Sequence, residues 1–75
     1  MPQEIPLLHC KVGQKVRVSH LLPVNKKELR KLSVFGILPG VEIEILQKYP
    51  ICVLRIGYKE VALDYEIGKS IVVRS

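Results

Sequence analysis

The sequence predicts an all-β domain: a small, partly open barrel of about five short strands with one short helix. Apolar and polar residues alternate in several segments, most regularly in Val41–Ile45, as they do in strands with one buried face. Only residues 26–34 carry helix signals at both ends. The chain has 75 residues, of which 48% are hydrophobic, so it should form one domain, residues 1–75, with one core. A barrel also hides most of the strand edges of so small a sheet.

The first part of the chain predicts an extended start, a turn and a strand. Residues 1–6 include two prolines and read as an extended lead-in. Residues 11–14 suit a turn. Val16 and Val18 then alternate with polar neighbours, which predicts a half-buried strand that continues toward His20.

The helix that follows has a start signal and a stop signal. Asn25 is a preferred N-cap residue, and Glu28 stands three positions later, the spacing of a capping box. Gly36 can adopt the left-handed conformation that closes a helix, with Leu32 and Ile37 in contact across the closure. So short a helix is not stable alone in water. We therefore expect its apolar side chains to dock on the sheet, namely Leu29, Leu32 and either Val34 or Phe35.

A turn and a strand come next. Pro39 and Gly40 suit the two central positions of a type II turn. In the strand after it, Val41, Ile43 and Ile45 are expected to point inward. The glutamates between them should point to solvent.

The rest of the chain predicts a hairpin and a last strand. Segments 51–56 and 59–63 are joined by Gly57 and Tyr58, which suit a two-residue hairpin turn with glycine first. Residues 65–68 predict a single helical turn or a loop. Residues 71–73 predict the final strand.

The positive charge is placed unevenly. The net charge is +5, and residues 1–40 carry seven basic and two acidic side chains, whereas residues 41–75 carry five of each. Four cations lie on the predicted helix: Lys26, Lys27, Arg30 and Lys31. They form either a solvated helix face or a docking surface for an acidic partner or nucleic acid.

Several functional classes are not indicated. The N-terminal segment lacks the basic and apolar regions of a secretory signal, and the longest uncharged run is about half of a membrane span. No Gly-rich phosphate loop is present, and Ser19 and His20, as neighbours on a strand, should point to opposite faces. We therefore expect a cytoplasmic protein that does not span the membrane and is not an enzyme.

Metal ligands are few and lack regular spacing. His9, Cys10 and His20 are weak candidates for binding iron or zinc, and no cofactor is required. Cys52 is expected in a strand as a small core residue. The two cysteines form no CxxC pair, which favours free thiols in a reducing compartment, although a single disulfide between them stays open.

The order of these features resembles the FeoA family of bacterial ferrous iron transport proteins. The most specific feature is Gly36-Ile37-Leu38-Pro39-Gly40 directly after the basic helix. It is preceded by a Gly-x-x-x-x-Val strand opening at Gly13–Val18 and followed by the alternating strand Val41–Ile45. The chain closes with the strand Ile71-Val72-Val73. The resemblance implies an SH3-like barrel.

The resemblance also implies a function. The chain is expected to be a small cytoplasmic accessory protein that contacts the FeoB transporter and its G-protein domain, with recruitment to the inner face of the membrane. The expected partner-binding residues are Lys26, Lys27, Arg30, Lys31, Phe35 and Leu38.

Two alternatives share the fold. One is a basic SH3-like module that binds nucleic acid, although no pair of aromatic residues is spaced for base stacking. The other is a detached SH3-like domain of a metal-dependent regulator. Such a domain would here lack its helix-turn-helix DNA reader.

Overall fold

The computed structural model describes residues 3–74, which form six strands, two α-helices and one 3-10 helix. In chain order these elements are β1 (Glu4–Pro6), η1 (Leu7–His9), β2 (Lys15–Leu21), α1 (Lys26–Val34), β3 (Glu42–Gln47), β4 (Ile51–Ile56), β5 (Lys59–Asp64), α2 (Tyr65–Gly68) and β6 (Ile71–Arg74).

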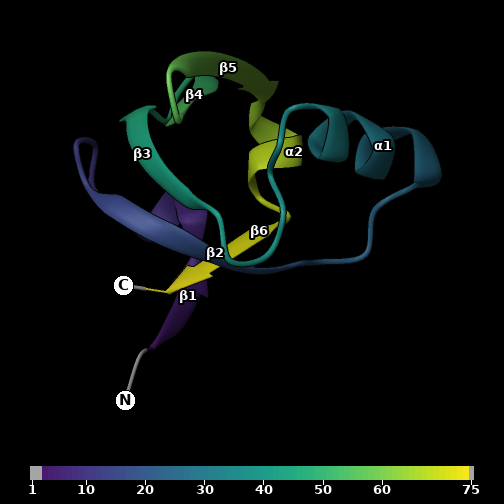
Figure 1. Cartoon of the computed structure of the whole chain (residues 1–75), viewed down its shortest axis with the longest axis horizontal. Coiled ribbons are helices and arrows are strands. Elements are labelled where there is room, and N and C mark those ends of the chain that lie inside the picture. The colour runs from purple at the N-terminus through teal and green to yellow at the C-terminus, as the bar shows by residue number, and fades with distance from the viewer. Residues whose placement is uncertain (1–2, 75) are drawn as a thin grey trace.

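The strands form one antiparallel sheet in the order β1-β6-β2-β3-β4-β5. Figure 1 shows the strands curling around a common interior, with helix α1 standing at one side of them. The predicted all-β class with one short helix is confirmed. The sheet gains a sixth strand, β1, inside the segment predicted as an extended lead-in, where Ile5 pairs with Val73 of β6.

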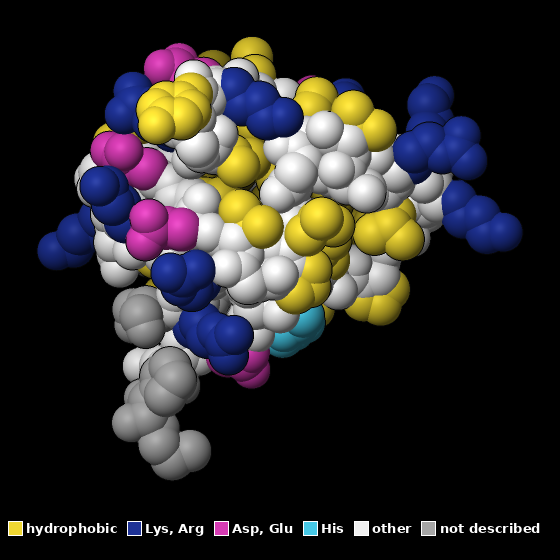
Figure 2. All heavy atoms as spheres, in the orientation of Figure 1, with side chains coloured by type: hydrophobic (Ala, Val, Ile, Leu, Met, Phe, Trp, Pro, Cys, Tyr) yellow, Lys and Arg dark blue, Asp and Glu magenta, His cyan; other side chains and the backbone are white. Residues whose placement is uncertain are grey.

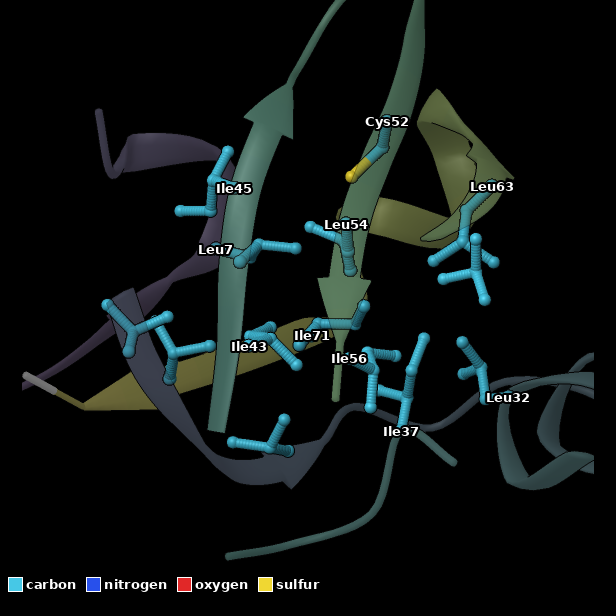
Figure 3. Packing of buried hydrophobic residues seen from close by; sticks show 14 of the residues in the cluster. Leu7, Leu32, Ile37, Ile43, Ile45, Cys52, Leu54, Ile56, Leu63 and Ile71 are labelled. Carbon is cyan, nitrogen blue, oxygen red and sulfur yellow. The ribbon is translucent and has the colours of Figure 1, made fainter. Parts of the chain in front are cut away.

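Alternate residues of the strands fill the interior of the barrel. The members of the cluster labelled in Figure 3 come from strands β3, β4, β5 and β6, from η1, from α1 and from the segment after α1. Ile43, Ile45 and Leu54 are at most 1% exposed. Val41 is half-buried against them. Cys52 is fully buried, so its predicted role as a core residue is confirmed, and both cysteines are free thiols.

Both ends of helix α1 are closed as the sequence predicts. The side-chain oxygen of Asn25 accepts a hydrogen bond from the backbone N–H of Glu28 over 2.8 Å. At the other end Gly36 has φ +82°, and the N–H of Ile37 donates to the carbonyl of Leu32 over 2.9 Å. This bond is the defining contact of a Schellman motif. Helix α1 therefore begins and ends at the residues that its local sequence predicts.

The predicted turn after the helix is also present, and it is attached to β2. The N–H of Val41 donates to the carbonyl of Leu38, and Gly40 between them has φ +89°. Gly40 donates to the carbonyl of Val18 over 2.8 Å and accepts from the guanidinium of Arg17 over 2.9 Å. These bonds hold the segment that carries Leu38 against the sheet.

Helix α1 touches the barrel along a narrow stripe. Leu32 is fully buried, whereas Leu29 is 48% and Val34 70% exposed, so the expectation that Leu29 docks is wrong. At 3.6 residues per turn, Val34 points about 160° away from Leu32 and Leu29 about 60° away. Phe35, the C-cap residue, is half-buried and packs on the core. Because α1 stands at the side of the barrel, only one row of its side chains is covered by the core.

The segment around η1 is fixed by a lysine from the β3–β4 loop. The Lys48 ammonium donates to the carbonyl oxygens of Cys10, over 2.7 Å, and Leu8, over 3.5 Å. Leu7 and Cys10 are buried beneath it. Lys48 satisfies carbonyls at the end of η1 that would otherwise lack partners.

The buried thiol of Cys52 predicts a pH dependence of stability. Burial raises its pKa from 9.0 to about 11. Between these values the folded protein holds a proton that the unfolded chain has lost, so the free energy of unfolding should fall as pH rises from 9.0 to about 11. The expected loss is on the order of 1 kcal/mol near pH 10. Urea unfolding of the wild type and Cys52→Ala, each at neutral pH and near pH 10, measures it. Equal pH dependence in both proteins would contradict the prediction.

Candidate partner-binding surface

The residues proposed from the sequence for partner binding lie together on α1 and on the segment that follows it. We call them the α1 surface: Lys26, Lys27, Arg30, Lys31, Phe35 and Leu38. All four cations are exposed, and Leu38 is 45% exposed. Phe35 is the exception, because it is half-buried and packs on the core. The α1 surface therefore offers four cations and one accessible apolar side chain, whereas Phe35 belongs in part to the core.

The charges on α1 are not neutralised by neighbours. Among residues 3–74, none of the four cations takes part in an ion pair, whereas Arg55 pairs with two glutamates and Lys69 pairs with Glu66. Figure 2 shows dark blue side chains projecting from the end of the molecule where Figure 1 places α1. The four cations thus make α1 the segment with the most closely spaced positive charges.

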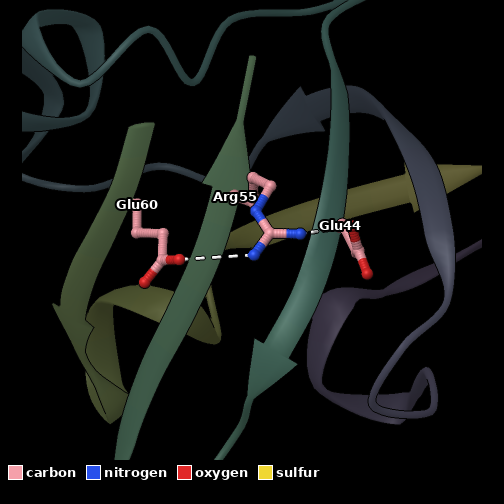
Figure 4. Close-up of polar contacts among 3 residues, drawn as sticks. All are labelled: Glu44, Arg55 and Glu60. Carbon is pink, nitrogen blue, oxygen red and sulfur yellow. Dashed lines mark hydrogen bonds and ion pairs between the residues drawn. The ribbon is translucent and has the colours of Figure 1, made fainter. Parts of the chain in front are cut away.

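The outer face of the sheet has the opposite character, because its charges balance within rows that run across the strands. Lys15, Glu44, Arg55 and Glu60 lie opposite one another on β2, β3, β4 and β5. Figure 4 shows Arg55 between the two glutamates, with 3.3 Å from its guanidinium to each carboxylate. A second row consists of Glu4, Arg74, Arg17 and Glu42. Each row sums to zero charge.

Three apolar side chains that the sequence analysis did not assign to partner binding are exposed on α1 or just before it. Leu22, before the helix, is 43% exposed, and Leu29 and Val34, on the helix, are 48% and 70% exposed. Figure 2 shows hydrophobic side chains gathered next to the cations of α1. The helical periodicity around Leu32 could have indicated the exposure of Val34, but the width of the buried stripe is a property of the folded barrel.

A shallow groove runs along one flank of α1. It has a volume of about 370 Å³, and Lys27 and Lys31 line it together with Asp64 and Ile67. The side of the groove opposite the helix therefore contributes the carboxylate of Asp64 and the side chain of Ile67, which belongs to the core. The groove adds shape to the α1 surface but no cluster of reactive groups.

The weak metal candidates do not form a built site. His9 is exposed and Cys10 is buried at the end of η1. Burial raises the pKa of the Cys10 thiol, and the nearby charge of Lys48 partly opposes this effect. Within residues 3–74, no group of three or more His, Cys, Asp or Glu side chains is placed to hold a metal ion.

Ser19 and His20 do not point to opposite faces, contrary to the expectation from a regular strand. The pairing of β2 with β6 shifts between Val18 and His20, so β2 contains a bulge. Ser19 donates to the Glu4 carboxylate, and its oxygen lies 3.2 Å from Nδ1 of His20, which is 3.6 Å from the same carboxylate. Because the serine hydroxyl faces a carboxylate acceptor, the cluster ties β1 to β2 and does not activate a nucleophile.

Comparison with known proteins points to one family. The sequence model of the FeoA domain matches residues 5–75. A FeoA-like protein from Clostridium acetobutylicum has 32% identity and a TM-score of 0.79, with 97% of this chain and 87% of that one aligned. A crystal structure of the iron uptake regulatory protein FeoA has 24% identity and a TM-score of 0.83, with 96% of both chains aligned.

The same fold occurs inside larger regulators. IdeR of T. acidophilum has a TM-score of 0.89 at 17% identity, and 95% of this chain covers only 33% of it. That likeness shows the fold alone. None of the curated proteins compared with the chain is similar enough in sequence to count as a relative. In residues 3–74, neither α-helix is long and apolar enough to cross a membrane.

Proposed function

Because this chain belongs to the FeoA family, we propose that it is a small accessory protein of bacterial ferrous iron transport that contacts the FeoB transporter from the cytoplasmic side. The family consists of small accessory proteins, not enzymes. Contact with a partner is therefore the way in which such a chain acts.

One observation carries this proposal to particular residues: the four cations of α1 form no ion pair in residues 3–74, and Leu38 is exposed on the turn that follows the helix. Cations on a projecting helix attract an acidic partner over a distance and orient its approach. Leu38 is held on a turn that hydrogen bonds attach to β2. A fixed and exposed apolar side chain suits the centre of an interface. The contact would place the protein at the inner face of the membrane.

We expect charge reversal on α1 to weaken this contact. Lys27 and Lys31 are neighbours one turn apart, so Lys27→Glu with Lys31→Glu inverts one flank of the helix. Binding to the soluble G-protein domain of the transporter should weaken by at least about tenfold, mainly through slower association, and should weaken further with added salt. Surface plasmon resonance with the purified domain measures both rates.

A matched variant controls for net charge. Lys11→Glu with Lys59→Glu makes the same change in total charge at two exposed positions outside α1, one before β2 and one at the start of β5. It should retain most of the affinity. If both double variants bind as the wild type does, the docking surface lies elsewhere on the barrel. Binding of duplex DNA by the wild type would instead support a nucleic-acid module.

We also propose that the protein requires no bound metal. The candidate ligands His9, Cys10 and His20 belong to no group of three or more such side chains. Iron or zinc should accordingly bind weakly and raise the melting temperature by little. Tight stoichiometric binding in calorimetry, abolished by His20→Ala or by His9→Ala with Cys10→Ala, would show that this view is wrong.

A further inference from the structure

Strand β5 is an edge of the sheet, and no other strand of residues 3–74 lies on its outer side. It runs over Lys59–Asp64 and pairs with β4 alone. Figure 1 places it at the rim of the molecule. The other edge, β1, has only three residues and ends in Pro6, which has no N–H to donate. Strand β5 is therefore the edge that can take up another strand.

The turn before β5 determines which of its backbone groups face outward. Gly57, with φ +62°, and Tyr58 form a two-residue turn, and Ile56 lies opposite Lys59 across it. In such a hairpin the two residues that flank the turn exchange their backbone hydrogen bonds. The Ile56–Lys59 pair thus sets the hydrogen-bonding pattern for the whole strand.

Hydrogen-bonded pairs alternate along an antiparallel ladder, so two residues of β5 direct their N–H and C=O groups away from β4. Lys59, Val61 and Leu63 bond to β4, whereas Glu60 and Ala62 face outward. Glu60 and Ala62 are both exposed, and within residues 3–74 their outward groups take part in no other backbone hydrogen bond. Four donors and acceptors are therefore available at the spacing of a β-ladder.

We propose that the free edge of β5 binds an extended segment of a partner protein, which joins the sheet as a further antiparallel strand. The backbone ladder provides the affinity in this mode of recognition, and alternate side chains provide the selectivity. The unpaired groups of Glu60 and Ala62 favour an extended chain over a helix, because a helix already uses its own N–H and C=O groups.

Charge indicates which side chains the added strand carries. Val61 and Leu63 are buried, so Glu60, Ala62 and Asp64 lie on the outer face. Glu60 and Asp64 are exposed and stand four positions apart. Opposite charges across neighbouring strands stabilise a pair, and like charges destabilise it. The bound segment should therefore carry Lys or Arg at two positions four residues apart, with an uncharged residue midway between them.

A second copy of this chain fits the edge less well, because its carboxylates would meet those of the first. A symmetric register centred on Ala62 places Glu60 of each copy opposite Asp64 of the other. A register centred on Val61 places the two Glu60 side chains diagonally across the seam. The acidic edge thus opposes self-association and favours a basic segment from a different protein.

Hydrogen exchange of the free protein, followed by NMR for single amides, tests the edge itself. The N–H groups of Val61 and Leu63 should be protected, whereas those of Glu60 and Ala62 should exchange rapidly. Protection of Glu60 and Ala62 that grows with protein concentration would show that a second copy covers the edge, and it would overturn the proposal.

A synthetic peptide tests the binding. The capped peptide Thr-Lys-Val-Thr-Val-Lys-Thr carries lysines four residues apart. At about ten times its Kd it should slow exchange of the Glu60 and Ala62 amides by about tenfold. The same peptide with both lysines changed to glutamate should bind at least about fourfold more weakly.

Methylation of the peptide backbone tests the ladder. In the proposed pairing the N–H of the central threonine points toward β5, whereas the N–H groups of the valines point away. A peptide methylated on the central threonine nitrogen should lose binding. The matched peptide methylated on a valine nitrogen should keep most of it.

Substitutions in the protein complete the test. Ala62→Pro removes an outward N–H without loss of a bond to β4, and proline is tolerated on edge strands. It should lower the affinity for the lysine peptide more than tenfold and leave the circular dichroism spectrum unchanged. Glu60→Gln with Asp64→Asn removes the edge charges without altering the backbone and should also weaken binding. Glu42→Gln with Glu66→Gln, which changes the net charge equally at exposed positions away from the edge, should not.

Three further results would overturn the proposal: no added protection at Glu60 and Ala62, equal affinity for the lysine and glutamate peptides, or equal binding of the two methylated peptides. The peptide contains no transporter sequence, so the inference does not rest on the proposed function. Failure of the peptide leaves the charge reversal on α1 as a valid test of the transporter contact, and failure of that contact leaves the edge unaffected.

Discussion

Replacing Leu32 with alanine should lower the free energy of unfolding by about 2–5 kcal/mol, the usual cost of emptying a fully buried leucine site. Leu32 is 0% exposed and is the one fully buried side chain of α1 within the described chain. It anchors the helix to the core. Without it, a helix of nine residues has too few internal hydrogen bonds to persist.

The same substitution at Leu29 is the matched control, because Leu29 stands on the same helix but is 48% exposed. Leu29→Ala should cost about 1 kcal/mol or less. Urea unfolding followed by circular dichroism gives both values. Hydrogen exchange should in addition show lost protection of α1 in Leu32→Ala alone. Equal destabilisation by the two variants would mean that α1 is not held by one buried stripe.

Replacing Gly36 with valine should cost about 1–3 kcal/mol, because a β-branched residue is strained at positive φ. Gly36 has φ +82°, and the nearest atom to a Cβ built there is 4.0 Å away, on Ile56. Space is therefore available, and the expected cost comes from the backbone conformation. Gly36→Asn should recover part of the stability, since asparagine tolerates this region better.

Thermal unfolding of the two Gly36 variants, with Ser33→Val beside them, measures the effect. Ser33 is exposed in the helix, so valine there should cost only a few tenths of a kcal/mol through helix propensity. If Gly36→Val melts at the wild-type temperature, the helix does not depend on its left-handed closure.

The helix ends could be predicted because their determinants are local. The bond from Glu28 to Asn25 and the bond from Ile37 to Leu32 each join residues at most five apart, and side-chain chemistry specifies both. The strands after Gly40 were likewise recognisable from alternation that one buried face requires. The exposed cations of α1 followed from the same helical periodicity.

The parts that the sequence did not predict depend on distant partners. Strand β1 exists because β6, near the other end of the chain, pairs with it. The bulge in β2 also depends on β6, and it alone brings Ser19 and His20 to Glu4. Leu29 is exposed because the barrel covers only the narrow stripe of α1 that contains Leu32. None of these has a signal in its own segment.

The two charge-balanced rows on the outer face of the sheet shape the electric field that the protein produces at a distance from its surface. With those rows cancelled, α1 carries four cations and one carboxylate, Glu28, and is the densest positive region, while Lys11, Lys48 and Lys59 lie apart from it. An extended negative surface therefore favours encounters that begin with α1. Glu60→Lys, which leaves Arg55 with one carboxylate partner, would add a competing positive region on the outer face of the sheet. It should thereby slow productive encounters although no contact residue has changed.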